Sequence, residues 1–207
     1  MKRKPILFNK LALKSGGLHR EVIGLIGIHH GAGVTHTGLM LAFHMGEELG
    51  KRTAYLECNS HQDMALVQRA YEWTKEETNS FSFHGITCFK EVERSGIPEI
   101  FNENYECIIL DFGIDFITNK EEFLRCDHKI VVGGSSEWDM IKLLDFSECA
   151  RVMKGSASWL YFIPYAGIHK IKRIQSEVAG RVYSVPYKEE PTLSSRETRQ
   201  FFNRVFH

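Results

Sequence analysis

A glycine-rich stretch follows the first apolar run of the sequence and has the layout of a phosphate-binding loop. The stretch reads His29, His30, Gly31, Ala32, Gly33, Val34, Thr35 and His36. Glycines let successive backbone N–H groups converge on a polyphosphate, and a hydroxyl at the end of the loop can bind Mg²⁺. Such a loop also needs a lysine beside that hydroxyl, but valine occupies the position. The sequence therefore predicts the geometry of a phosphate loop without its principal cation.

Acidic and amide side chains end two later apolar runs. Glu57 and Asn59 follow residues 53–56, and Asp111 follows residues 105–110. Because the carboxyl ends of parallel strands meet at one edge of a sheet, we expect these side chains to lie beside the loop. We assign Glu57, Asn59 and Asp111 to catalysis, and Thr35 and Asp111 to Mg²⁺ binding. A helix cap at Thr35 and a turn residue at Asp111 remain the alternatives.

The spacing of apolar residues predicts the elements that position this chemistry. Expected strands are 22–28, 53–56, 105–111, 129–133, 159–163 and 182–186, and expected helices are 39–50, 64–75, 97–103, 138–154, 168–179 and 194–206. Residues 76–87 are interpreted as a loop with at most a short strand. Strands that alternate with helices are typical of an α/β fold, doubly wound, with a mostly parallel sheet covered by helices on both faces.

Composition limits the domain organisation and the cell compartment. The chain has 207 residues, of which 43% are hydrophobic and 25% charged, which fits one domain. The first twenty residues contain basic but no acidic side chains, so we predict a basic, solvated leader at 1–20 and a single domain at 21–207. Five cysteines without a Cys-x-x-Cys pair are typical of a reducing cytosol, so we expect a cytoplasmic protein without a zinc ribbon. Nucleic acid is not an expected partner.

Four segments, in order, resemble the MinD/ParA ATPases. Residues 29–42 resemble that family's deviant phosphate loop, Lys-Gly-Gly-x-Gly-Lys-Thr-Thr, followed by its apolar helix. Residues 50–59 resemble its second strand with paired acids, and residues 105–113 resemble its Tyr-x-x-Ile-Ile-Asp segment. Residues 183–186, followed by 192–206, resemble its closing strand and helix. The resemblance implies the P-loop NTPase fold, ATP or ADP with Mg²⁺ as cofactor, a nucleotide-dependent homodimer and a protein partner.

The departures from the family pattern fall on its chemistry. The two family lysines correspond to His29 and Val34, and the first glycine of the loop corresponds to His30. Loss of a cation that stabilises transition-state charge removes several kcal/mol of catalysis, so we expect at most a weak ATPase. His29 and His36 are interpreted as partial replacements that donate to phosphate. Loops without the lysine resemble the pilus-assembly TadZ/CpaE branch, which implies a localisation or scaffolding role.

Three hypotheses of function follow from these residues. The first is a slow or inactive ATPase-like switch that positions a partner machine, such as a pilus or secretion apparatus, at a membrane or cell pole. The second is a nucleotide-free scaffold that binds partners, a pseudo-ATPase. The third is a working ATPase that uses a basic residue from elsewhere, Arg52 or Arg94.

Other interpretations of the same residues receive less weight. A Rossmann site lacks its third glycine, since position 36 is His, and a histidine–cysteine metal cluster lacks a standard ligand spacing. The closing helix carries an apolar face, which we expect to dock on the sheet. A membrane-binding face is the alternative. The residues of that face are Phe201, Phe202, Val205 and Phe206.

Overall fold

The structure is a computed structural model that describes residues 20–71 and 78–206. The predicted leader lies outside these ranges except for Arg20, and so do residues 72–75 of the second expected helix. The Arg20 guanidinium donates hydrogen bonds to the carbonyls of Phe101, Glu103 and Tyr105. Arg20, the first residue that the structure describes, is therefore held to the domain by hydrogen bonds.

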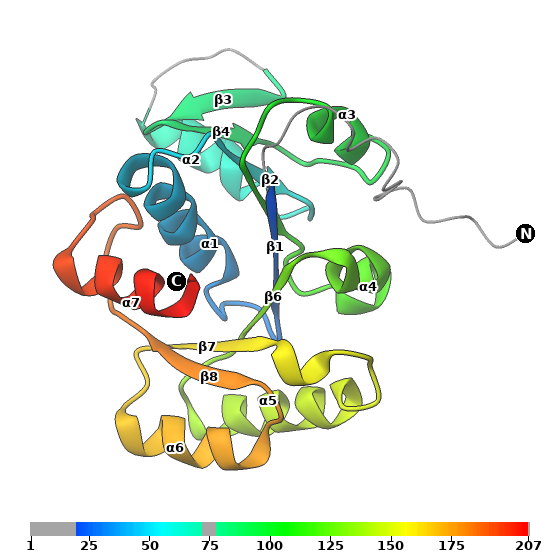
Figure 1. Cartoon of the computed structure of the whole chain (residues 1–207), viewed down its shortest axis with the longest axis vertical. Helices are drawn as coiled ribbons and strands as arrows, with labels where there is room; N and C mark the ends of the chain where they lie inside the picture. Colours follow the sequence, from blue (N-terminus) through cyan, green and yellow to red (C-terminus); the bar gives the residue numbers. More distant parts are fainter. Residues whose placement is uncertain (1–19, 72–77, 207) are drawn as a thin grey trace, which may run out of the picture.

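Eight strands of the described chain form one sheet (Figure 1). They are β1 (Glu21–Gly27), β2 (Thr53–Glu57), β3 (Ser80–Phe83), β4 (Ile86–Phe89), β5 (Cys107–Asp111), β6 (His128–Val132), β7 (Leu160–Pro164) and β8 (Arg181–Val185). Their order is β3-β4-β2-β5-β1-β6-β7-β8, and every neighbouring pair is parallel except β3 with β4. The carboxyl ends of seven strands therefore meet at one edge, with β1 between β5 and β6.

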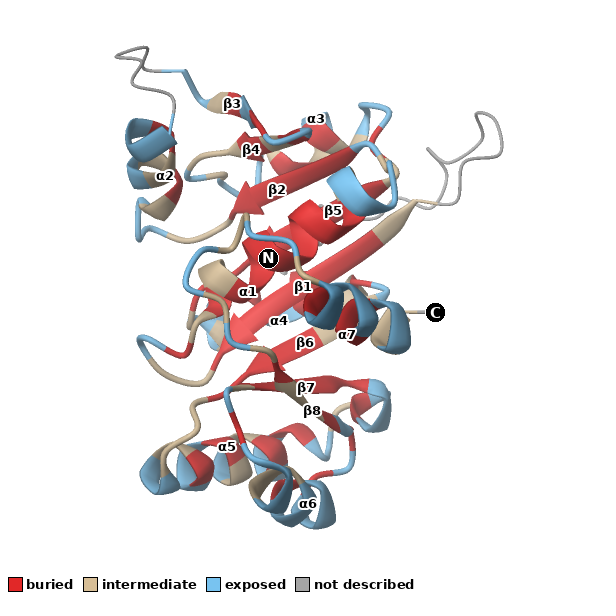
Figure 2. Cartoon of the chain, turned by 90° about the vertical axis from the view of Figure 1, so that its left-hand side faces the viewer, coloured by how far each residue is buried: buried red, intermediate tan, exposed pale blue. Residues whose placement is uncertain are grey.

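Helices cover both faces of this sheet. One face carries α1 (Val34–Phe43), α2 (Asp63–Tyr71) and α7 (Arg196–Phe206), and the other carries α3 (Ile97–Phe101), α4 (Phe116–Arg125), α5 (Glu137–Ala150) and α6 (Ile168–Glu177). Figure 1 shows α1 and α7 on one side of the strands and α4 on the other. The central strands between these layers are buried (Figure 2). This arrangement confirms the predicted doubly wound, mostly parallel α/β fold. None of the described helices is both long and apolar enough to cross a bilayer.

Three local predictions differ from the structure. Helix α1 begins at Val34, five residues earlier than expected, and continues as a π-helical turn over His44–Glu48. Residues 76–87 are expected to be a loop with at most a short strand, but residues 80–89 form the β3–β4 hairpin, which turns at His84 and Gly85 with φ of 45° and 76°. Helix α4 is absent from the predicted elements, because the polar residues 118–122 separate its apolar ends and interrupt the helical period.

The closing helix docks on the sheet, as expected. The side chains of Phe201 and Phe202 are 3% and 0% exposed. The Phe202 ring lies 5.3 Å from that of His44, and the Phe201 ring lies 5.4 Å from that of Phe162. Val205 and Phe206 pack against the same core. The domain itself therefore covers the apolar face that a membrane-binding α7 would need.

Candidate functional site

The loop between β1 and α1 has the geometry of an anion-binding turn. Gly31 and Gly33 have φ of 76° and 90°, a left-handed conformation that glycine adopts without strain. A Cβ atom added at Gly31 would meet nothing within 4 Å, so this part of the loop faces open space. Helix α1 has no side-chain cap on its first turn and no acidic residue within it. Its first backbone amides and the positive end of its dipole are thus available to an anion.

Three oxygen-bearing side chains meet beside this turn. The Thr35 hydroxyl lies 2.8 Å from an Asp111 carboxylate oxygen and 3.0 Å from one of Asp63. A hydroxyl carries a single proton, so it can donate to only one of the two carboxylates at a time. Hard oxygen ligands of this kind suit Mg²⁺. The donor set therefore fits the predicted metal residues, Thr35 and Asp111, and adds Asp63 to them.

Asp111 is held at the centre of this group. Its side chain is 1% exposed and accepts hydrogen bonds from the Tyr55 hydroxyl at 2.6 Å and the Gly113 amide at 2.8 Å. Burial raises the pKa of Asp111 above its ordinary value, although the bonds from Tyr55, Gly113 and Thr35 oppose the shift. A nearby cation would favour its charged form.

The two other predicted catalytic residues lie at the same edge. Glu57 pairs with Asp111 in the register of β2 and β5, but its carboxylate accepts from the amides of Met64 and Glu91, each at 3.2 Å. Burial raises the pKa of Glu57 as well. The Asn59 side-chain amide donates to the carbonyl of Asp111 at 3.1 Å, and the Cys58 amide donates to the same oxygen at 2.8 Å. These contacts tie the loop after β2 to the end of β5.

Val34 fills the position of the absent lysine with a buried side chain. It is 7% exposed, and its Cγ2 methyl lies 2.6 Å from the point where a Cβ on Gly27 would be. Glycine at position 27 therefore makes room for Val34 against the end of β1. Ala32, 4% exposed, belongs to the same hydrophobic core. The two apolar residues of the loop anchor it to the domain.

The histidines of the loop face protein groups. His29 Nε2 lies 3.1 Å from Asp139 Oδ1 on α5, and the His30 ring lies 5.6 Å from that of His61. His36 bonds the backbone of Lys188, and burial lowers the pKa of His36, which disfavours the imidazolium needed to replace a lysine.

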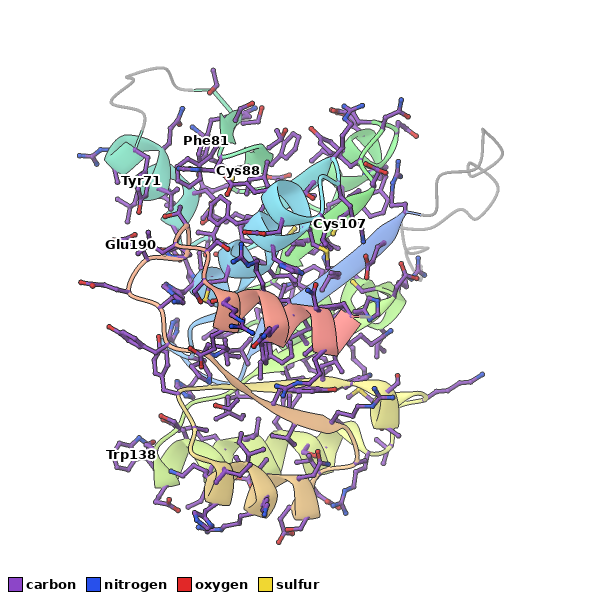
Figure 3. All side chains as sticks on the ribbon, turned by 60° about the vertical axis from the view of Figure 1, so that its left-hand side comes forward. Tyr71, Phe81, Cys88, Cys107, Trp138 and Glu190 are labelled. Atoms are coloured by element: carbon purple, nitrogen blue, oxygen red, sulfur yellow. The ribbon has the colours of Figure 1, made fainter. Side chains whose placement is uncertain are left out.

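The segment after β8 reaches across this helix face to α2. Figure 3 shows Tyr71 and Glu190 near one another, and the Tyr71 hydroxyl donates to the Glu190 carboxylate. The contact of His36 with Lys188 belongs to the same segment. This segment therefore packs over the first turn of α1.

Two alternatives for the chemistry find no support in the geometry. Arg52 precedes the five residues of β2, and at about 3.3 Å per residue it stands roughly 16 Å from the site, with its guanidinium over Tyr105. It cannot replace the loop lysine. Among the described residues, no group of three or more His, Cys, Asp or Glu side chains could hold a metal ion, so the histidine–cysteine cluster is not formed.

Asp63 is the site residue that sequence reasoning missed. It is the first residue of α2 and immediately precedes the helix expected over 64–75. The available signal was a carboxylate six residues after the end of β2, because β2 ends at the same edge of the sheet as the strand before the phosphate loop.

A doubly wound sheet with a glycine-rich turn between its central strand and the following helix belongs to the class of α/β folds in which ligands bind at the carboxyl ends of the strands. No model of a known protein family matches the sequence. No curated protein is similar to it in sequence.

Solved structures narrow the architecture further. A ParA family ATPase from Chlorobium tepidum superposes with a TM-score of 0.63 at 15% identity, covering 89% of this chain and 92% of that one. The septum site-determining protein MinD from Pyrococcus horikoshii, in complex with Mg-ADP, gives 0.63 at 13% identity, covering 90% and 94%. A plasmid partition protein from Borrelia burgdorferi bound to AMPPNP gives 0.60 at 10% identity, covering 90% and 99%. The chain has the fold of the MinD/ParA-type P-loop ATPases.

Proposed function

We propose that this protein binds the phosphates of ATP or ADP at residues 29–36, with Mg²⁺ held by Thr35 and Asp111, and hydrolyses ATP slowly or not at all. One observation carries the proposal. Two left-handed glycines open the first turn of α1 to an anion, while the neighbouring Val34 is buried. When bound, Mg²⁺ offsets the charge of the phosphates. The nucleotides in the MinD and plasmid partition structures support the same ligand class here.

The contacts of the site support slow chemistry. Glu57 and Asn59 are the candidates to orient a water molecule, but the Glu57 carboxylate already accepts from two backbone amides. His29 faces Asp139, and burial lowers the pKa of His36, which disfavours its charged form. Because removal of one group that stabilises transition-state charge costs about 3–4 kcal/mol, turnover falls by about 10²–10³-fold.

A switch for a partner machine is the role that we propose for such a site. Nucleotide binding would control a homodimer, and the dimer would recruit a protein partner that localises or assembles a larger apparatus, of the pilus or secretion kind. The resemblance to the TadZ/CpaE branch supports this role. A MinC:MinD complex from Aquifex aeolicus is among the structures of similar fold, so a protein partner is compatible with this architecture.

A nucleotide-free scaffold is the second candidate, and the buried apolar side chain of Val34 favours it. Calorimetric titration with ADP, ATP and AMPPNP, each with and without Mg²⁺, separates the two. We expect Mg²⁺-dependent binding with little phosphate release. Absence of binding at millimolar nucleotide would establish the scaffold. Fast release of phosphate would instead support an active ATPase that uses a basic residue from elsewhere in place of the loop lysine, and Arg94 lies near the carboxyl end of β2, beside Cys58 and Asn59.

A pair of glycine variants locates the binding. Gly31→Ala and Gly50→Ala both place a methyl group on a left-handed glycine with nothing within 4 Å. Both substitutions strain the backbone alike, but only Gly31 lies in the loop. We expect Gly31→Ala alone to weaken nucleotide binding. Equal affinities for the two variants would place the nucleotide elsewhere.

A further inference from the structure

A cavity of about 720 Å³ opens beside the carboxyl ends of β2 and β5. It lies toward the α4 face of the sheet, where Val92, Phe112 and Ile114 give it apolar walls. Its volume is within the range of pockets that hold small molecules. No residue of the phosphate loop lines it.

Carboxylates dominate the charge around this cavity. The acidic side chains that line it are Glu93, Asp115, Glu121 and Glu122, against a single guanidinium, that of Arg94. Asp115 accepts from the Thr118 amide at 3.0 Å as the cap of α4. Hydrogen bonds from the Thr118 side chain and from its amide keep the pKa of Asp115 below the ordinary value. The cavity therefore attracts positive charge and repels anions such as phosphate.

Glu122 is the least satisfied of these acids. It lines the cavity, yet it is 3% exposed, and its Oε2 atom has no hydrogen-bond partner in the described chain. Burial raises the pKa of Glu122, while the nearby charges of Arg125 and Arg94 oppose the shift. A buried acceptor without a donor has a cost in free energy, and the cost is larger when the acceptor is charged. A donor that carries positive charge would remove that cost.

We propose that this cavity binds a small organic cation, an alkylammonium or guanidinium group that donates to Glu122. The apolar chain of the ligand lies against Phe112 and Ile114, and its cationic end meets the carboxylates. A bare metal ion fits less well, because the described His, Cys, Asp and Glu side chains form no group of three that could hold one. The group could belong to a free amine or to a basic side chain of a protein partner, since both offer the same chemistry.

Isothermal titration with 1,5-diaminopentane, and separately with glutarate, tests the proposal on the full chain. The two probes have five carbons each and opposite charge. We expect the diamine to bind and glutarate not to bind. Because a hydrogen bond to a charged group is worth about 1.5–3 kcal/mol, Glu122→Gln should weaken diamine binding about tenfold or more. Glu197→Gln, an exposed glutamate on α7 at the opposite face, should leave it unchanged.

A second probe separates the two sources of the cation. An alanine peptide with one central arginine and blocked ends presents the guanidinium as a protein would. Binding of the diamine assigns a free amine, and binding of the peptide alone assigns a partner's side chain, provided that Glu122→Gln weakens it. The proposal is overturned if neither probe binds. It is also overturned if the Glu122→Gln variant melts at the wild-type temperature and binds the probe as tightly as the wild type does. Nucleotide is absent from these titrations, so their failure would leave the phosphate loop untouched.

Discussion

Replacement of Val34 by lysine tests whether phosphate occupies the loop. The wild-type side chain is 7% exposed and packs at Gly27, so a lysine must turn its stem toward the loop. The lost burial costs about 1–1.5 kcal/mol, or roughly 2–6 °C in melting temperature. An ammonium bonded to a phosphate is worth about 1.5–3 kcal/mol, so the Kd for ATP should fall by about 10–100-fold.

Isothermal titration at fixed salt measures this gain, and Val34→Met is its matched control. Methionine has a similar length without charge, so its affinity should stay at the wild-type value. A folded Val34→Lys variant that binds ATP no better than Val34→Met would refute the reasoning. Phosphate would then lie beyond the reach of position 34, and the glycine turn would be a structural feature alone.

Three further predictions concern other parts of the molecule. Thr35→Val removes the hydroxyl that faces Asp63 and Asp111, so nucleotide affinity measured with Mg²⁺ and with EDTA should become equal. Phe202→Ala should lower the free energy of unfolding in urea by about 3–5 kcal/mol because the ring is fully buried, whereas the exposed Asn203→Ala should change it by less than about 0.5 kcal/mol. The raised pKa of Asp111 means that the folded state holds this proton more tightly than the unfolded state. The stability of the wild type relative to Asp111→Asn should therefore fall as pH rises from the ordinary carboxyl range through the raised pKa, and a flat difference in urea unfolding would contradict it.

Continuous apolar runs made most of the sheet predictable. Residues 107–111 read Cys-Ile-Ile-Leu-Asp, an apolar run that indicates a buried central strand, and the structure buries every one of them. The β3–β4 hairpin is hard to predict because each strand has only four residues, which is too short for the alternation of Phe81, Ser82 and Phe83 to form a clear period. Helix α4 is hard to predict because its apolar residues stand at its two ends, and the polar residues 118–122 between them interrupt the helical period.

The site was predictable where it depends on neighbours in sequence. The spacing of the glycines placed the turn, and the position of Asp111 after an apolar strand placed a carboxylate beside it. The contact of His29 with Asp139 joins residues far apart in the chain, so no local pattern contains it. The same holds for burial of the Val34 side chain against Gly27. Tertiary packing decides which way these side chains turn.

The two hydrogen bonds that the Asp111 carbonyl oxygen accepts restrict the motion of the loop after β2. The Cys58 amide and the Asn59 side chain both donate to this one oxygen, at 2.8 and 3.1 Å. The loop after β2 cannot swing away from the end of β5 without breaking both bonds together. Local opening at this edge is thus cooperative, and the Cys58 amide should exchange its hydrogen only when the whole loop is released. A ligand that displaces Asp111 would therefore move the loop that precedes α2, and a contact made on that loop would act back on Asp111.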